Sequence, residues 1–182
     1  MKTTLLCTVL LSTICGNVAS AEFCHYPNTN RLVWDDDFSQ RIHRFLGEGR
    51  ESFFYNGLLY EQVLAGLGGP PDPILDIGNG SRFASACRAH SCTEKAAVVI
   101  ACPDEVLAVG ILHFDVGPKR FNAMHATLTI YSARLDGQVR SAFENWRRHV
   151  AEVDAIDIAT DYRQLVRPAL QPTETHVDYR NE

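Results

Sequence analysis

Apolar residues recur at helical spacing in three parts of the chain, and each part predicts a helix with one buried face. In residues 35–46 the apolar positions share one face, an acidic run favours the helix N-terminus, and Gly47 supplies a stop. A second, shorter helix is predicted over residues 58–67, because Gly68-Gly69 and the prolines that follow cannot continue it. The third predicted helix covers residues 139–150 and carries charged residues on its outer face.

Between the second and third helices the pattern changes to short runs rich in Val, Ile and Leu, separated by turn residues. Because sequential strands with short connections favour hairpins, these runs predict an antiparallel meander. The chain is therefore expected to be α+β, a single domain with a central antiparallel sheet of about five strands flanked by short helices. The predicted strands cover residues 74–77, 82–86, 94–101, 106–115 and 125–132.

The start of the chain has the pattern of a secretory signal peptide. Lys2 gives a positive charge, residues 5–14 form an apolar run, and Ala19-Ser20-Ala21 offers a small-residue cleavage site. The run is too short to span a bilayer. We therefore expect residues 1–21 to be removed, the domain to cover 22–167, residues 168–182 to form a polar tail, and the protein to be periplasmic or secreted.

The charge of the chain narrows the class of partner. The formal net charge is −5 over 182 residues, with 17 Lys+Arg against 22 Asp+Glu. An acidic balance argues against nucleic acid or an anionic membrane as the partner, and it fits a basic protein. The sequence leaves the oligomeric state, monomer or homodimer, open.

Removal of the signal peptide changes the cysteine count. Four of the six cysteines remain, and an even number in an exported protein favours two disulfides with three alternative pairings. We favour Cys87–Cys92 together with Cys24–Cys102. The chain-entropy relation gives about 2 kcal/mol for the short loop and roughly 4–5 kcal/mol for the long one. The long bridge would stabilise the fold, whereas the short one would shape a local loop.

The short loop, Cys87-Arg88-Ala89-His90-Ser91-Cys92, places a histidine between the two cysteines. A disulfide would close it into a rigid loop with the imidazole near its tip, a shape suited to insertion into another molecule's cleft. Three other interpretations stay open. The disulfide could simply rigidify a turn, the Cys and His residues could bind zinc, or the thiols could be a redox pair. The spacing matches neither a paired zinc knuckle nor Cys-x-x-Cys, and export favours oxidation.

This hexapeptide, followed by apolar runs at residues 95–100 and 106–114, resembles the Ivy family, inhibitors of vertebrate lysozyme. The resemblance implies a periplasmic α+β domain with a central antiparallel sheet and a protruding disulfide loop of pattern Cys-Lys-Pro-His-Asp-Cys. In that family the loop histidine enters the lysozyme cleft and engages the catalytic carboxylates. Cys87, His90 and Cys92 match the pattern directly.

The other three loop positions differ from the family pattern. Arg88 replaces the lysine and keeps its charge, Ala89 replaces the proline, and Ser91 replaces the aspartate. The resemblance implies a basic lysozyme-type glycosidase as partner and neither enzyme activity nor a cofactor or metal. Animal-type lysozymes are commonly basic, so an acidic inhibitor would gain mainly in association rate.

Two other functions remain as alternatives. The first is an exported structural or adaptor domain whose loop binds another envelope protein. The second is a small secreted hydrolase, because His113 and Asp115 share one face of a predicted strand and His125 follows. The sequence contains none of the nucleophile-elbow, His-Glu-x-x-His or phosphate-loop motifs that would support it.

Overall fold

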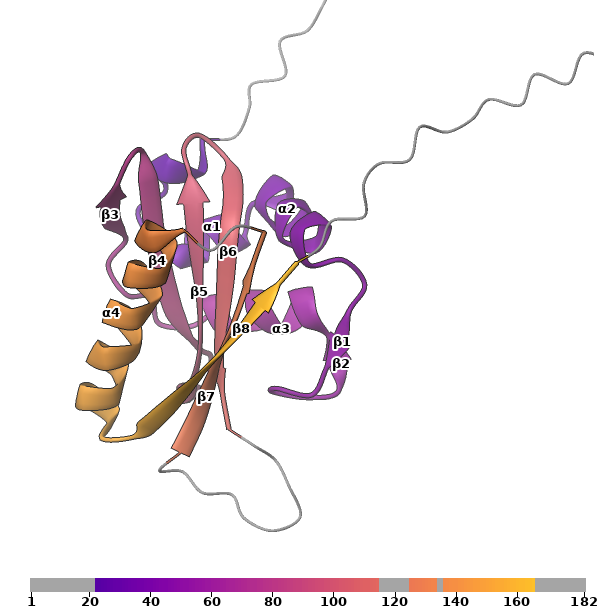
Figure 1. Ribbon diagram of the computed structural model, residues 1–182. Coiled ribbons are helices and arrows are strands. Elements are labelled where there is room, and N and C mark those ends of the chain that lie inside the picture. Colours follow the sequence, from indigo (N-terminus) through magenta and orange to yellow (C-terminus); the bar gives the residue numbers. More distant parts are fainter. Residues whose placement is uncertain (1–21, 115–124, 134–135, 166–182) are drawn as a thin grey trace, which may run out of the picture.

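The five predicted strands are present, and they lie side by side in chain order (Figure 1). The computed structural model describes residues 22–114, 125–133 and 136–165. Neighbouring strands among these five pair antiparallel, so the predicted meander is confirmed. The strands are β3 (Leu75–Gly78), β4 (Ser81–Arg88), β5 (Ser91–Ala101), β6 (Glu105–His113) and β7 (His125–Ser132).

A sixth strand, β8 (Asp157–Gln164), corrects the prediction of a five-stranded antiparallel sheet. It pairs parallel with β7, so the sheet is mixed. A parallel neighbour requires a crossover, and α4 (Gly137–Asp154) supplies it. The sequence of β8, DIATDYRQ, is mostly polar and its burial is partial, which is why it contains no apolar run to predict a strand.

The three predicted helices are confirmed, with small changes at their ends. α2 (Asp36–Leu46) begins after Asp35, whose carboxylate accepts hydrogen bonds from the backbone N–H groups of Asp37 and Phe38. α3 (Leu59–Leu67) ends at Gly68, and α4 extends beyond the predicted 139–150 at both ends. The sequence did not predict four short elements: η1 (Phe23–His25), α1 (Thr29–Val33), β1 (Arg50–Glu51) and β2 (Gly57–Leu58).

Helices cover both faces of the sheet. One apolar cluster joins α1, α2 and α3 to Ala96, Val98 and Ile100, whereas a second joins α4 to Ala97 and Val99. Successive residues of a strand point to opposite faces, so both sets of side chains on β5 are buried. Burial on both faces explains why β5 has a continuous apolar run, although it pairs antiparallel with both of its neighbours.

Two disulfides are present. Cys24–Cys102 joins η1 to the turn between β5 and β6 over a sequence separation of 78, and Cys87–Cys92 closes the turn between β4 and β5. None of the helices in the described part of the chain is long and apolar enough to cross a membrane. The predicted signal peptide (1–21) and polar tail (168–182) lie outside the described residues.

Gly110 sets the spacing between β6 and α4 and provides a test of the fold. A Cβ atom at this position would lie 2.4 Å from Cε1 of Phe143, whose ring is fully buried. We expect Gly110→Ala to lower the free energy of unfolding by about 1–3 kcal/mol through overpacking. Urea unfolding of the purified protein measures the change.

Gly137→Ala is the matched control, because a Cβ atom there meets no atom within 4 Å. Its effect should stay within about 0.5 kcal/mol. Equal stabilities for the two variants would contradict the packing of α4 on β6 described above.

Candidate functional site

The β4–β5 hairpin carries the predicted loop at its turn. Arg88 pairs with Ser91, which leaves Ala89 and His90 as the two turn residues, and the Cα atoms of Cys87 and Cys92 lie 4.6 Å apart. Cys87 is buried, whereas Ala89 and His90 are exposed. The hairpin is therefore anchored at its base and presents the imidazole of His90 to solvent.

His90 adopts a left-handed backbone conformation, with φ of +65°. Only a few per cent of residues other than glycine have this conformation, although histidine adopts it more often than most. The β4–β5 register also shifts between Cys87 and Arg88, so β5 has extra residues opposite this point. The backbone conformation and the disulfide together fix the direction in which the side chain leaves the turn.

Arg88 braces the hairpin from one side. Its guanidinium forms an ion pair with Glu94 on the returning strand and lies over the rings of Phe54 and Tyr55, at 5.5 and 5.9 Å from the ring centroids. Burial and the Glu61 charge raise the pKa of the Tyr55 hydroxyl, and the Arg88 charge opposes that rise. The Arg88 side chain is thus held against the domain rather than extended into solvent.

The aromatic support under Arg88 is itself held by α3. Gln62 is fully buried, and its side-chain oxygen accepts a hydrogen bond from the backbone N–H of Phe54 at 2.9 Å. Its side-chain nitrogen donates to the backbone oxygens of Glu51 and Gly57. One buried amide therefore satisfies three backbone groups of the β1–β2 connection and fixes the position of Phe54.

Residues 69–72, which we call the strap, brace the hairpin from the edge of β4. The backbone oxygen of Pro70 accepts a hydrogen bond from the N–H of Cys87 at 3.2 Å. The N–H of Asp72 donates to the backbone oxygen of Ser85 at 2.9 Å. A Cβ atom on Gly69 would lie 2.2 Å from the Cys87 oxygen and 2.7 Å from the Ala89 nitrogen. Only glycine fits at this close approach.

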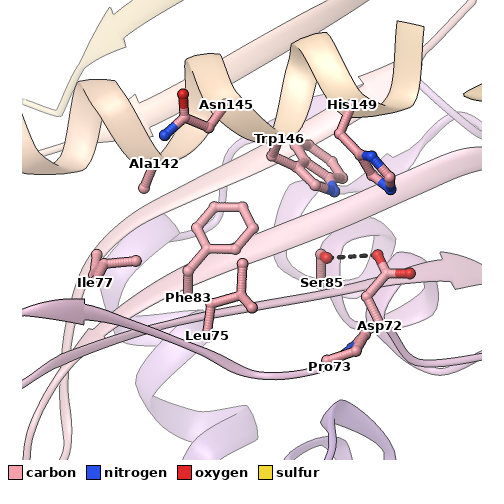
Figure 2. A pocket seen from close by; sticks show the side chains of 10 residues that line it. All are labelled: Asp72, Pro73, Leu75, Ile77, Phe83, Ser85, Ala142, Asn145, Trp146 and His149. Carbon is pink, nitrogen blue, oxygen red and sulfur yellow. Dashed lines mark hydrogen bonds between the residues drawn. The ribbon is translucent and has the colours of Figure 1, made fainter. Parts of the chain in front are cut away.

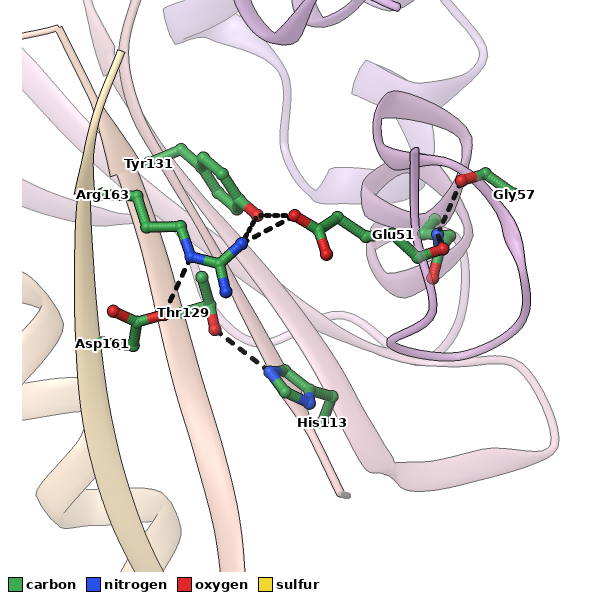
Figure 3. Close-up of polar contacts among 8 residues, drawn as sticks. Glu51, Gly57, His113, Thr129, Tyr131, Asp161 and Arg163 are labelled. Atoms are coloured by element: carbon green, nitrogen blue, oxygen red, sulfur yellow. Dashed lines mark hydrogen bonds and ion pairs between the residues drawn. The ribbon is translucent and has the colours of Figure 1, made fainter. Parts of the chain in front are cut away.

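His113 and His125, the histidines of the hydrolase alternative, lie on β6 and β7 and have structural partners. The ring of His113 is buried and lies tilted against the Phe53 ring, with centroids 4.1 Å apart. Its Nε2 lies 3.0 Å from the Thr129 hydroxyl oxygen (Figure 3). His125 is exposed, with Nδ1 3.2 Å from an Asp157 oxygen. Asp115 lies outside the described residues.

A polar cluster on the same side of the sheet as His113 joins β1 to β7 and β8 (Figure 3). Arg163 donates to Glu51 at 2.6 Å and to the Tyr131 hydroxyl at 2.9 Å, and Tyr131 donates to Glu51 at 3.2 Å. Burial raises the pKa of Tyr131, with Arg163 opposing and Glu51 adding to the rise. The phenol therefore remains a neutral donor at physiological pH and ties the last strand to the first.

Metal-ligating side chains do not gather elsewhere in the structure. Within residues 22–114, 125–133 and 136–165, no three His, Cys, Asp or Glu side chains lie close enough together to hold an ion. Cys87 and Cys92 are bonded to each other, and Asp35 caps α2. The hairpin itself presents a constrained and exposed imidazole.

Sequence reasoning identified Cys87, His90 and Cys92 but missed the groups that brace them. In the sequence, Gly68-Gly69 and the prolines after them predict only a helix stop, although residues 69–72 form the strap. Arg88 and Glu94 lie close together in the sequence. The contact of Arg88 with Phe54, in contrast, joins two segments that no local sequence pattern connects.

Comparison with known proteins gives one family. No curated protein and no solved structure matches the chain. The family model described as "Inhibitor of vertebrate lysozyme (Ivy)" matches residues 56–148, just over half of the 182 residues, and this segment includes the strap, the hairpin and most of α4. The chain belongs to the Ivy family of vertebrate lysozyme inhibitors.

Proposed function

We propose that this protein is an exported inhibitor of a lysozyme-type glycosidase and that the Cys87–Cys92 hairpin enters the catalytic cleft of its target. One observation carries the proposal: the exposed imidazole of His90 stands at the turn of a disulfide-closed hairpin within the segment that matches the family. The two disulfides fit an oxidising compartment outside the cytosol.

The chemistry of the target suits an imidazole. A retaining glycosidase holds two carboxyl groups about 5–5.5 Å apart, and one of them is ionised. The two ring nitrogens of His90 form hydrogen bonds to both carboxyl groups, and a protonated ring donates to each. Hydrogen bonds to charged groups contribute about 1.5–3 kcal/mol each. The inhibitor blocks the cleft without making or breaking a covalent bond.

Rigidity of the hairpin adds to affinity, because a loop that is already ordered loses less entropy on binding. Ala89 lacks the conformational restriction of the proline in the family pattern. Here the disulfide, the strap and the Arg88 contacts restrict the same segment. The acidic net charge, −5 over the full sequence, favours fast association with a basic target.

His90→Ala tests the role of the imidazole. We expect its inhibition constant against a susceptible lysozyme to rise at least about thirtyfold, the loss typical of a central contact residue worth 2 kcal/mol or more. Turnover of bacterial cell walls, with animal-type lysozymes and lytic transglycosylases as targets, measures inhibition.

His25→Ala is the control, because this exposed histidine lies in η1, outside the hairpin, and pairs with Glu22. It should inhibit like the parent protein. No inhibition of any target by the parent protein would refute the function, and full inhibition by His90→Ala would refute the mechanism.

Gly69→Ala tests the strap without altering any residue that faces the target. The added Cβ atom overlaps the backbone of Cys87 and Ala89, and the strain of about 1–3 kcal/mol must be relieved by displacing the hairpin. The inhibition constant should rise roughly tenfold while circular dichroism shows a folded protein.

For comparison, Gly49→Ala places its Cβ atom 3.9 Å from the nearest backbone oxygen, an ordinary contact. It should leave inhibition unchanged. If both variants inhibit equally, the strap does not position the hairpin.

The double substitution Cys87→Ser with Cys92→Ser tests the contribution of the disulfide. The freed hairpin should lose more conformational entropy on binding, so the inhibition constant should rise several-fold. The free energy of unfolding should fall by about 2 kcal/mol, less than the roughly 4–5 kcal/mol expected on loss of Cys24–Cys102, which closes a far longer loop. An unchanged inhibition constant would show that the disulfide does not preorganise the hairpin.

A further inference from the structure

A cavity of about 380 Å³ lies between α4 and the edge of the sheet formed by β3 and β4 (Figure 2). Its walls are mainly apolar, and Leu75 remains 54% exposed at its rim. Cavities of this size hold small molecules, since one of about 150 Å³ holds benzene. The walls are formed by Leu75, Ile77, Phe83, Ala142 and Trp146.

One end of the cavity is polar. Figure 2 shows Asp72, Ser85 and His149 gathered there, with the indole nitrogen of Trp146 on the same side of its ring. The Ser85 hydroxyl donates to the Asp72 carboxylate at 2.6 Å, which keeps that carboxylate at the cavity. The carboxylate retains lone pairs that accept further hydrogen bonds.

Trp146 supplies an observation that points to a ligand. The residue is only 7% exposed, and within the described part of the chain its indole N–H has no hydrogen-bond partner. Buried donors in folded proteins are normally paired, so an unpaired one requires an explanation. An acceptor atom brought into the polar end of the cavity, with a small adjustment of the ring, would satisfy it.

We infer that this cavity binds a small, uncharged amphiphile, with an alkyl or aryl body against Phe83 and Trp146 and a head group that both accepts and donates hydrogen bonds. The head accepts from the Trp146 indole and donates to Asp72. A carboxylate has no donor for Asp72 and is repelled by its charge, and an ammonium group offers no acceptor to the indole. A primary amide or an alcohol meets both requirements.

The cavity and the strap share Asp72 and Ser85 but use different atoms of them: the strap is joined to β4 by the Asp72 N–H and the Ser85 backbone oxygen, whereas the cavity is lined by the side chains. None of the side chains that line it takes part in the Arg88 contacts or in the hairpin turn. Ligand binding is therefore expected whether or not His90 blocks a glycosidase, and the two proposals fail separately.

The two tryptophans of the chain allow a direct test. Trp34→Phe removes the exposed tryptophan and leaves Trp146 as the only indole. The ¹⁵N-labelled variant is titrated with octanamide, octanoate and octylamine, and the indole N–H resonance of Trp146 is followed by NMR. Octanamide should move this resonance downfield in a saturable manner and bind at least tenfold more tightly than octanoate. Octylamine should give no downfield shift.

Three substitutions in the Trp34→Phe background sharpen the test. Ala142→Leu fills the cavity and should abolish the octanamide shift, whereas Ser141→Leu, at an exposed position on the same helix, should preserve it. Asp72→Asn should raise the affinity for octanoate at least tenfold. The absence of a saturable octanamide shift, or its persistence in Ala142→Leu, would overturn the site. Equal affinity of the unsubstituted cavity for octanoate and octanamide would overturn the assignment of the head group.

Discussion

The close contact between the strap and the end of β4 is the constraint on which the presentation of His90 depends. Gly69 leaves no space for a side chain beside the backbone of Cys87, and the N–H of Cys87 is already bonded to Pro70. The edge of β4 is therefore covered where the hairpin leaves the sheet. Beyond the end of β3, the strap thus pairs with backbone groups of β4 that would otherwise be unpaired.

The two sides of the hairpin are braced by different kinds of interaction. The strap acts through backbone hydrogen bonds and steric contact, whereas Arg88 acts through charge and aromatic stacking. Behind Arg88, Gln62 links the aromatic support to α3, which packs on the central strands. The exposed turn is thus connected to the apolar core through buried contacts, and its rigidity derives from the fold rather than from the disulfide alone.

Much of this fold was predictable, because amphipathic helices and buried strands leave strong local patterns. The helix at Asp36–Leu46 has a cap, an apolar face and a glycine stop, so its limits were almost correct. β8 has none of these signals and is ordered by pairing with β7 and by the Arg163 contacts with Glu51 and Tyr131. The hairpin cysteines and His90 were predictable from spacing, whereas Phe54 and the strap meet the hairpin only through tertiary packing.

The central claim is that the hairpin occupies the catalytic cleft of a lysozyme. It is tested most directly by measuring the affinity of the protein for a susceptible animal-type lysozyme at increasing concentrations of tri-N-acetylchitotriose, a ligand of that cleft. Competition is expected: the apparent dissociation constant should rise linearly with the free sugar concentration. An affinity that stays constant when the sugar saturates the cleft would contradict it.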